Sequence, residues 1–192
     1  MGMTNKRHIK SDVLRQLYGM PRDLVVNAYA PMLEETSIHF IQNSPFILIS
    51  SISKDGNVDI SPKGGEPGFV KIIDEQHLAF LDKPGNKKLH TVENLYNSSK
   101  VGLMFMIPGV GDFLRIHGEA YATNDTQMIA EMGGNDRHNK LIFHVEITKV
   151  FPHCPSAAKH SKLWQVNENN DESIPGVTAM AMSLAKSREA LE

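Results

Sequence analysis

The sequence is short of cysteine, of net charge and of long hydrophobic runs. Its 192 residues include one cysteine, Cys154, so no disulfide can form within the chain, as is usual in a reducing compartment. The formal net charge of −2 provides no strong positive field for nucleic acid. No apolar run is long enough to span a bilayer, and the basic N-terminus lacks the apolar core of a signal peptide. We therefore expect a cytoplasmic globular protein that binds neither nucleic acid nor membranes.

The nine histidines also lack the spacing of a metal site. Neither an H-x-x-x-H nor an HExxH pattern occurs. The one adjacent pair of soft ligands, His153 and Cys154, would point to opposite faces of a strand. We therefore predict no metal centre.

Short strands in consecutive hairpins dominate the middle of the chain. An Asp-Gly turn at residues 53–57 and a two-residue connection after residue 74 are hairpin signals. Seven strands are predicted, at residues 46–52, 58–62, 69–74, 77–82, 101–108, 113–123 and 141–151. The strand at 101–108 is apolar enough to be buried on both faces. Sequential antiparallel pairing favours a barrel or closed sandwich over a doubly wound sheet.

Helices are expected on either side of these strands. Helical spacing occurs in residues 12–30, interrupted by Gly19 and Pro21, and again in residues 32–43, 124–132 and 177–190. We therefore expect a mainly β chain with flanking helices, of the α+β class, forming one domain over residues 1–192. Its parts would be N-terminal helices (1–43), a barrel core (44–165), and a polar linker with a C-terminal helix (166–192).

Two lysines stand where the chain is expected to enter a helix. The segment LDKPGNKKLHTVENL, residues 81–95, ends a strand, turns, and would open a helix with Lys87 and Lys88. Because a helix N-terminus carries partial positive charge, each lysine would cost a few tenths of a kcal/mol there. A bound phosphate would turn this cost into a gain, since the backbone N–H groups, the helix dipole and both ammonium groups would all attract it. The alternative is that both lysines are merely solvated.

A second basic turn, rich in glycine, follows the strand at residues 58–62. In the segment DISPKGGEPGF, residues 59–69, Ser61 offers a hydroxyl group and Lys63 a charge. Gly64 and Gly65 allow the backbone to approach a ligand closely. The segment matches neither the Walker nor the G-x-G-x-x-G pattern, and an ordinary loop is the alternative.

Taken in order, five segments of the chain resemble the pyridoxamine 5′-phosphate oxidase-like, FMN-binding split-barrel family. Within it, the chain is similar to a bacterial subgroup of FMN-dependent enzymes without an assigned substrate. The segments are SPFILISS (44–51), DGNVDISPKGGEPGFVKIID (55–74), DKPGNKKLHTVENL (82–95), VGLMFMIPGVGDFLRIHGEA (101–120) and VFPHCPSAAKHSKLW (150–164). The resemblance implies a six-stranded antiparallel Greek-key split barrel. It also implies a homodimer with two FMN sites at the interface.

The resemblance further implies which residues contact the phosphate of FMN. Asn86, Lys87 and Lys88 correspond to the phosphate-binding loop of the family, in agreement with the charge argument above. Ser61 and Lys63 correspond to a strand end near the phosphate or the ring.

Four more residues are implied to lie near the ring or to come from the second subunit. Arg115 corresponds to a segment that crosses the flavin, and is a candidate for the ring or the ribityl chain. Lys159, Ser161 and Trp164 would come from the partner subunit, although Trp164 has the alternative of filling the barrel end.

The sequence departs from the pyridoxal-forming oxidases at two places. Those enzymes carry an arginine where Ser61 stands, and the segment HSKLWQVNEN replaces their C-terminal arginine and histidine motif. We therefore expect an FMN-dependent oxidoreductase that transfers hydride to or from an unknown small molecule, rather than vitamin B6 oxidation. A flavin carrier without turnover, or a relative that binds haem or F420, remains as an alternative. No residue stands out for proton transfer.

Overall fold

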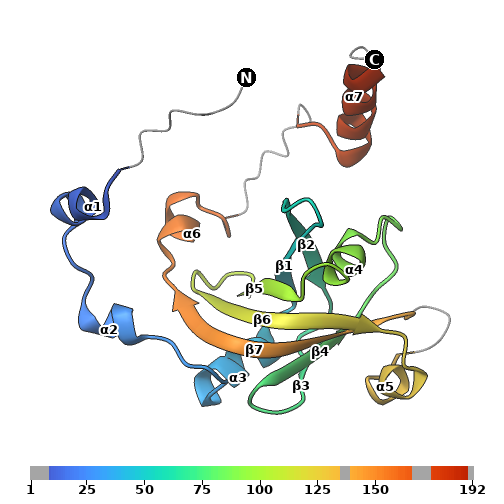
Figure 1. The fold of residues 1–192 in the computed structure, drawn as a ribbon, viewed down its shortest axis with the longest axis horizontal. Coiled ribbons are helices and arrows are strands. Elements are labelled where there is room, and N and C mark those ends of the chain that lie inside the picture. The colour runs from blue at the N-terminus through green and yellow to red at the C-terminus, as the bar shows by residue number, and fades with distance from the viewer. Residues whose placement is uncertain (1–8, 135–138, 166–173, 190–192) are drawn as a thin grey trace.

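One curved antiparallel sheet forms the centre of the molecule (Figure 1). The computed structural model describes residues 9–134, 139–165 and 174–189, so the predicted linker at 167–173 lies outside the described residues. The strands are β1 (Phe46–Ile52), β2 (Val58–Gly64), β3 (Val70–Ile72), β4 (His77–Leu81), β5 (Lys100–Met106), β6 (Phe113–Thr123) and β7 (Ile142–His153). Their hydrogen-bonded order is β2-β1-β5-β6-β7-β4-β3.

The predicted hairpins are confirmed, and so is the strand count of seven. In the β1–β2 hairpin, the Asp-Gly turn closes with Gly56 at φ 78°, a conformation that glycine adopts without strain. The six-stranded barrel implied by the resemblance, and the closed sheet favoured by the hairpins, are wrong. The sheet has seven strands, and within the described residues its edge strands β2 and β3 are not hydrogen-bonded to each other. Pro62 lacks an N–H group and is tolerated in β2 because that strand is an edge.

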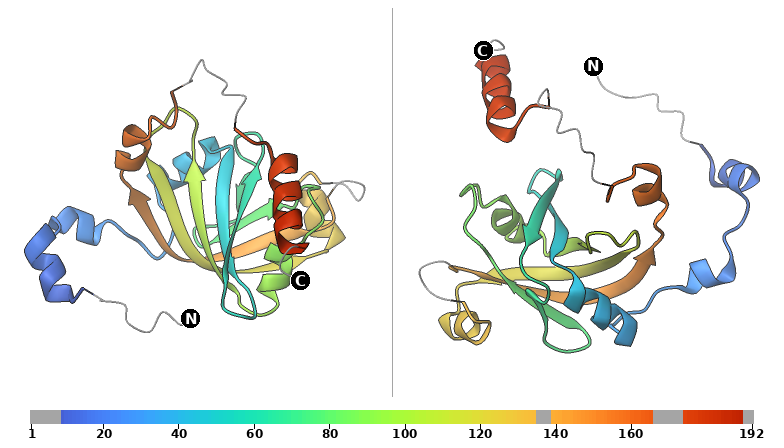
Figure 2. Two further views of the ribbon diagram at one scale, coloured as in Figure 1. Left: turned by 90° about the horizontal axis from the view of Figure 1, so that it is seen from above. Right: turned by 180° about the vertical axis from the view of Figure 1, so that it is seen from behind.

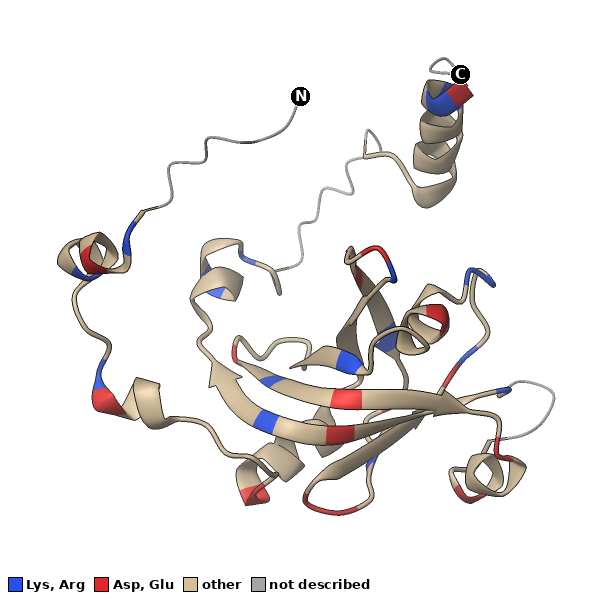
Figure 3. Cartoon of the chain, in the orientation of Figure 1, with Lys and Arg blue, Asp and Glu red and all other residues tan. Residues whose placement is uncertain are grey.

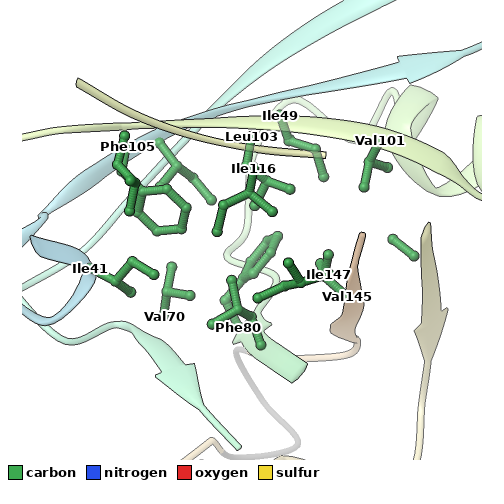
Figure 4. Close-up of a cluster of buried hydrophobic side chains, with 14 of the residues drawn as sticks. Ile41, Ile49, Val70, Phe80, Val101, Leu103, Phe105, Ile116, Val145 and Ile147 are labelled. Carbon is green, nitrogen blue, oxygen red and sulfur yellow. The ribbon is translucent and has the colours of Figure 1, made fainter. Parts of the chain in front are cut away.

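The inner face of the curved sheet carries the core (Figure 4). Alternate residues of each strand point inward, so Ile47 and Ile49 of β1 meet Phe105 of β5 and Phe143 of β7 in one continuous cluster. Helix α3 (Glu35–Asn43) adds Ile41, which is fully buried.

Strand β5 is buried on one face only, contrary to the expectation from its apolar sequence. Val101, Leu103 and Phe105 point inward and are buried, whereas Met104 and Met106 face outward and are half-buried. The outer face of the sheet is therefore only partly covered, and its apolar residues remain within reach of another surface.

The close packing of β6 on β7 depends on one glycine. The register of the two strands shifts between His117 and Gly118. A Cβ atom at Gly118 would collide with the carbonyl oxygen of Glu146, so only glycine fits there.

Seven helices occur in the described part of the chain, and they differ in what they cover. They are α1 (Ser11–Tyr18), α2 (Asp23–Asn27), α3, α4 (His90–Leu95), α5 (Thr126–Glu131), α6 (Ser156–His160) and α7 (Val177–Glu189). α3 contacts β3 and β6, and α4 contacts β1, β2 and β6. In contrast, α1, α2 and α7 bury no residue and stand apart from the sheet (Figure 2). None of the described helices has both the length and the apolar content needed to cross a bilayer.

Candidate functional site

A cleft of about 880 Å³ lies where the open edge of β2 faces the loop between β4 and α4. We call it the lysine cleft. Its charged lining residues are Asp59, Lys63, Asp82, Lys83, Lys87, Lys88 and Lys140, with His90 beside them. Five lysines against two aspartates make the cleft cationic in a chain whose net charge is slightly negative. Figure 3 shows this positive charge along the loop that leads into α4.

Five of the nine predicted site residues line this cleft. Ser61 and Lys63 are two residues apart on β2, so they share one face of the strand. Both are half-buried and line the cleft. Asn86, Lys87 and Lys88 come from the loop on the opposite wall and are exposed. Strand β2 extends to Gly64, so Lys63 lies in the strand and not in a turn after residue 62 as predicted. The two basic segments recognised separately in the sequence are nevertheless neighbours in space. Their contact with a cofactor stays a prediction.

The helix behind the loop begins later than the sequence suggested. α4 starts at His90, and both Lys87, at φ 62°, and Leu89, at φ 57°, have left-handed backbone conformations that cannot continue a helix. The side chain of Asn86 accepts a hydrogen bond from the backbone N–H of Lys88 at 3.0 Å, which stabilises the turn. The two lysines therefore precede the helix. The argument from the helix dipole at a first-turn position is therefore wrong, and the clustered positive charge of the loop is what remains.

Lys63 differs from the loop lysines because it already has a carboxylate partner. Its ammonium group lies 2.9 Å from Oδ1 of Asp82, and both side chains are only 20% exposed. It also lies 5.0 Å from the ring centroid of Phe143. In the described part of the chain, no carboxylate is paired with Lys83, Lys87 or Lys88. The loop thus supplies the charge that a ligand could neutralise.

Two lysines of the cleft were absent from the sequence prediction. Lys83 lies within residues 81–95, next to the two predicted lysines, so its charge is visible in the sequence. Lys140 precedes β7 and reaches the cleft only because β7 pairs with β4. Pairing between strands so far apart in sequence has no local signal.

Arg115 lies outside the lysine cleft. It is on the outer side of β6, and its guanidinium carbon sits 4.2 Å from the ring centroid of Phe151 on β7. The Nε atom of Arg115 is buried, and within the described structure it has no hydrogen-bond partner. A buried donor without a partner is unfavourable, so this group is suited to an acceptor from another molecule.

The other three predicted residues also lie away from the cleft of their own chain. Lys159 is exposed on α6, and the hydroxyl of Ser161 donates to the carbonyl of Ala158 at 3.3 Å. The indole N–H of Trp164 donates to the carbonyl of Val110 at 2.8 Å, which ties this segment to the β5–β6 loop. Their supply by a partner subunit stays a prediction. Among the described residues, no three histidine, cysteine or acidic side chains gather as a metal site would require.

Comparison with known proteins identifies the family. The family model described as pyridoxamine 5′-phosphate oxidase matches residues 33–154, which is more than half of the chain. The chain therefore belongs to the pyridoxamine 5′-phosphate oxidase family. No curated protein sequence matches it.

Several solved structures match the chain at low sequence identity. A HupZ variant of Group A Streptococcus is 14% identical with a TM-score of 0.51, and the match covers 64% of this chain and 100% of that chain. A candidate pyridoxamine 5′-phosphate oxidase from Lactobacillus delbrueckii is 22% identical with a TM-score of 0.49, over 64% of this chain and 95% of that one. An FMN-binding protein from Syntrophomonas wolfei is 15% identical with a TM-score of 0.47, over 74% and 96%.

Proposed function

We propose that the lysine cleft binds FMN and that the protein is an FMN-dependent oxidoreductase acting on a small molecule. The observation that carries this proposal is the gathering of Lys83, Lys87 and Lys88, without carboxylate partners in the described chain, at one wall of the cleft in a member of this family. A phosphate dianion beside several ammonium groups forms charge-assisted hydrogen bonds, which are the strong ones.

The residues of the cleft fit such a ligand in size and in chemistry. A volume of about 880 Å³ lies in the range of small-molecule sites, roughly 300–1,000 Å³. The lysine loop supplies cations for a phosphate at one wall. The hydroxyl of Ser61, half-buried on the opposite wall, supplies a neutral donor and acceptor for the uncharged part of a ligand.

FMN, when bound, supplies the electron-transfer chemistry, and the chain's own residues bind and orient it. Lys87 and Lys88 would neutralise the phosphate and fix that end of the ligand. Asp82 holds the ammonium group of Lys63 at one position, so the opposite wall presents a charge that is already partly compensated. We assign no proton-transfer residue in the described chain.

We further propose that two copies of the chain form a homodimer with the cofactor at their interface. Arg115, Lys159, Ser161 and Trp164 lie outside their own chain's cleft, as a contribution to the second copy's site requires. The buried, unpartnered Nε of Arg115 supports this arrangement, because it leaves a donor available on the outer face of the sheet.

A titration with FMN and with riboflavin tests the cofactor assignment. Riboflavin has the same ring without the phosphate, so we expect FMN to bind at least ~100-fold more tightly, which corresponds to about 2.7 kcal/mol. Quenching of flavin fluorescence measures both affinities. Equal affinities, or tighter binding of haem or F420 in parallel titrations, would overturn the assignment.

Turnover is tested separately from binding. Reduction of the bound flavin by NAD(P)H, followed by reoxidation with candidate small-molecule acceptors, is expected of an oxidoreductase and is measured by absorbance. Flavin that stays oxidised with every donor would instead indicate a carrier.

A further inference from the structure

The N-terminal arm, residues 9–32, exposes far more apolar surface than its length accounts for. It is an eighth of the chain, yet it contains eleven of the 24 large hydrophobic residues exposed in the described structure. Tyr18, Met20 and Leu24 are each about four-fifths exposed. Single exposed apolar residues need no explanation, but such a concentration is typical of an interaction surface.

The base of the arm is anchored to the body of the protein. Ala30 exchanges two backbone hydrogen bonds with Val150 of β7, at 3.0 and 2.8 Å. Next to them, the ammonium group of Lys149 lies 4.4 Å from the ring centroid of Tyr29, and Leu33 is buried in the core. The arm thus leaves the body at a fixed place, beside the outer side of β7.

Beyond that anchor, the arm covers nothing in its own chain. α1 and α2 bury no residue, and both views of Figure 2 show them standing away from the sheet. In α1, Val13, Leu14 and Leu17 recur at helical spacing and give the helix one apolar face. A short amphipathic helix gains its stability mostly from packing that face against another surface.

The accessible surface of the chain is larger than that of a compact protein of the same mass. The accessible surface is 14387 Å², whereas a compact monomer of 21.4 kDa exposes about 9,100 Å². The helices α1, α2 and α7 bury no residue, so they contribute to this difference.

We propose that this arm packs on a second copy of the chain and holds the dimer together. This proposal rests on the homodimer proposed above. The arm's anchor on β7 adjoins the outer side of β6 and β7, where Arg115 offers its unpaired donor, so the arm continues the proposed interface. At the far edge of the sheet, Val58 and Ile60 of β2 are about two-thirds exposed, and this chain's own arm points away from them (Figure 1). In a dimer, the arm of one copy would pack against Val58 and Ile60 on β2 of the second copy.

Sedimentation of the full chain tests the arm. The variant Leu17→Glu with Leu24→Glu changes two side chains that contact no core, so each chain stays folded. We expect the wild-type protein to be a dimer and the variant to self-associate ~100-fold more weakly, since charges would enter an apolar interface. Ile73→Glu, at a position 53% exposed in the β3–β4 turn, is the matched control and should change nothing. A monomeric wild type, or a variant as dimeric as the wild type, would overturn the proposal.

Photo-crosslinking identifies what the arm touches. A photoreactive residue at position 17, in unlabelled chains mixed with ¹⁵N-labelled chains, should give crosslinked peptides of mixed isotope content. Crosslinks confined to one chain would show that the arm folds back on its own sheet, and would refute the proposal.

FMN titration of the same variant separates the two proposals. If the variant is monomeric and keeps its FMN, the arm proposal stands and the cofactor site does not need the dimer. If it is monomeric and loses FMN, both stand. If it stays dimeric, the arm proposal fails, whatever its affinity for FMN.

Discussion

Two kinds of lysine face the same cleft, and their neighbours give them different roles. The side chain of Lys63 is four-fifths buried and forms an ion pair with Asp82, so its charge is largely neutralised within the chain. Lys87 and Lys88 are exposed on a turn and, within the described chain, have no carboxylate partner. Residue type alone does not separate them. The difference shows that a cationic site is defined by which charges are left uncompensated.

Reversing the uncompensated charges should have the largest effect. Lys87→Glu combined with Lys88→Glu places two anions where a phosphate is expected, so we expect FMN affinity to fall by at least ~100-fold. Fluorescence titration measures the loss. Lys54→Glu, in the β1–β2 turn outside the cleft, is the control and should retain affinity. An unchanged affinity in the double variant would show that Lys87 and Lys88 do not bind the phosphate, and that being unpaired gives them no role that Lys63 lacks.

Removing Lys63 should affect stability more than binding. Lys63→Met keeps the apolar stem but leaves Asp82 mostly buried without its cation, which should lower the free energy of unfolding by about 1–2 kcal/mol. Urea denaturation measures this change. FMN affinity should fall less than in the double loop variant. A larger loss of affinity than of stability would show that Lys63 acts as a ligand-binding charge as well.

Glu34 is a carboxylate that is stabilised by hydrogen bonds alone, in contrast to Asp82. The hydroxyl of Thr36 hydrogen-bonds Glu34, and with the backbone N–H groups of Thr36 and Ser37 it lowers the pKa of Glu34 to about 2. Glu34 caps α3, so Glu34→Ala should cost about 1 kcal/mol at neutral pH.

The same lowered pKa fixes the sign of a pH dependence. Because the folded pKa lies below the unfolded one, this stabilisation is complete above about pH 4.5 and is lost as the pH falls toward 2. Urea denaturation across that range should show the loss in the wild type and not in Glu34→Ala. Parallel curves would contradict the role of the cap.

Neutralising Asp82 should leave the charge of Lys63 uncompensated, as the charges of Lys87 and Lys88 are. Asp82→Asn keeps a hydrogen-bond acceptor and removes one negative charge from the cleft, so we expect FMN to bind roughly 3-fold more tightly. Fluorescence titration at low ionic strength measures the gain, which added salt should reduce. Weaker binding would show that the aspartate itself contacts the ligand.

Removing an exposed ion pair should have the smallest effect on stability. Lys100 lies 2.9 Å from Glu119, but their side chains are 71% and 46% exposed. Solvent screens such pairs, so Lys100→Ala should leave the urea midpoint within measurement error. A shift as large as that of Lys63→Met would mean that burial does not explain the difference between the pairs.

Local sequence signals accounted for most of the elements and for the two walls of the cleft. The Asp-Gly turn at residues 53–57 and the two-residue connection after residue 74 are encoded by neighbouring residues, so the β1–β2 and β3–β4 hairpins were predicted correctly. The start of α4 was wrong because the turn that delays it depends on the backbone conformation of Lys87 and Leu89, for which neither side chain carries a strong signal. The six-stranded closed barrel was wrong because strand pairing across the chain decides whether a sheet closes.

The strands, their hairpins and the two basic segments could be predicted from sequence, since each follows from residues close together in the chain. Three features became visible only in the folded chain: the basic segments form one cleft, Lys63 is paired with Asp82, and Arg115 lies outside the cleft. The physical reason is that these outcomes depend on pairing between distant strands, such as β4 with β7. That pairing is fixed by burying a shared apolar core rather than by any local pattern.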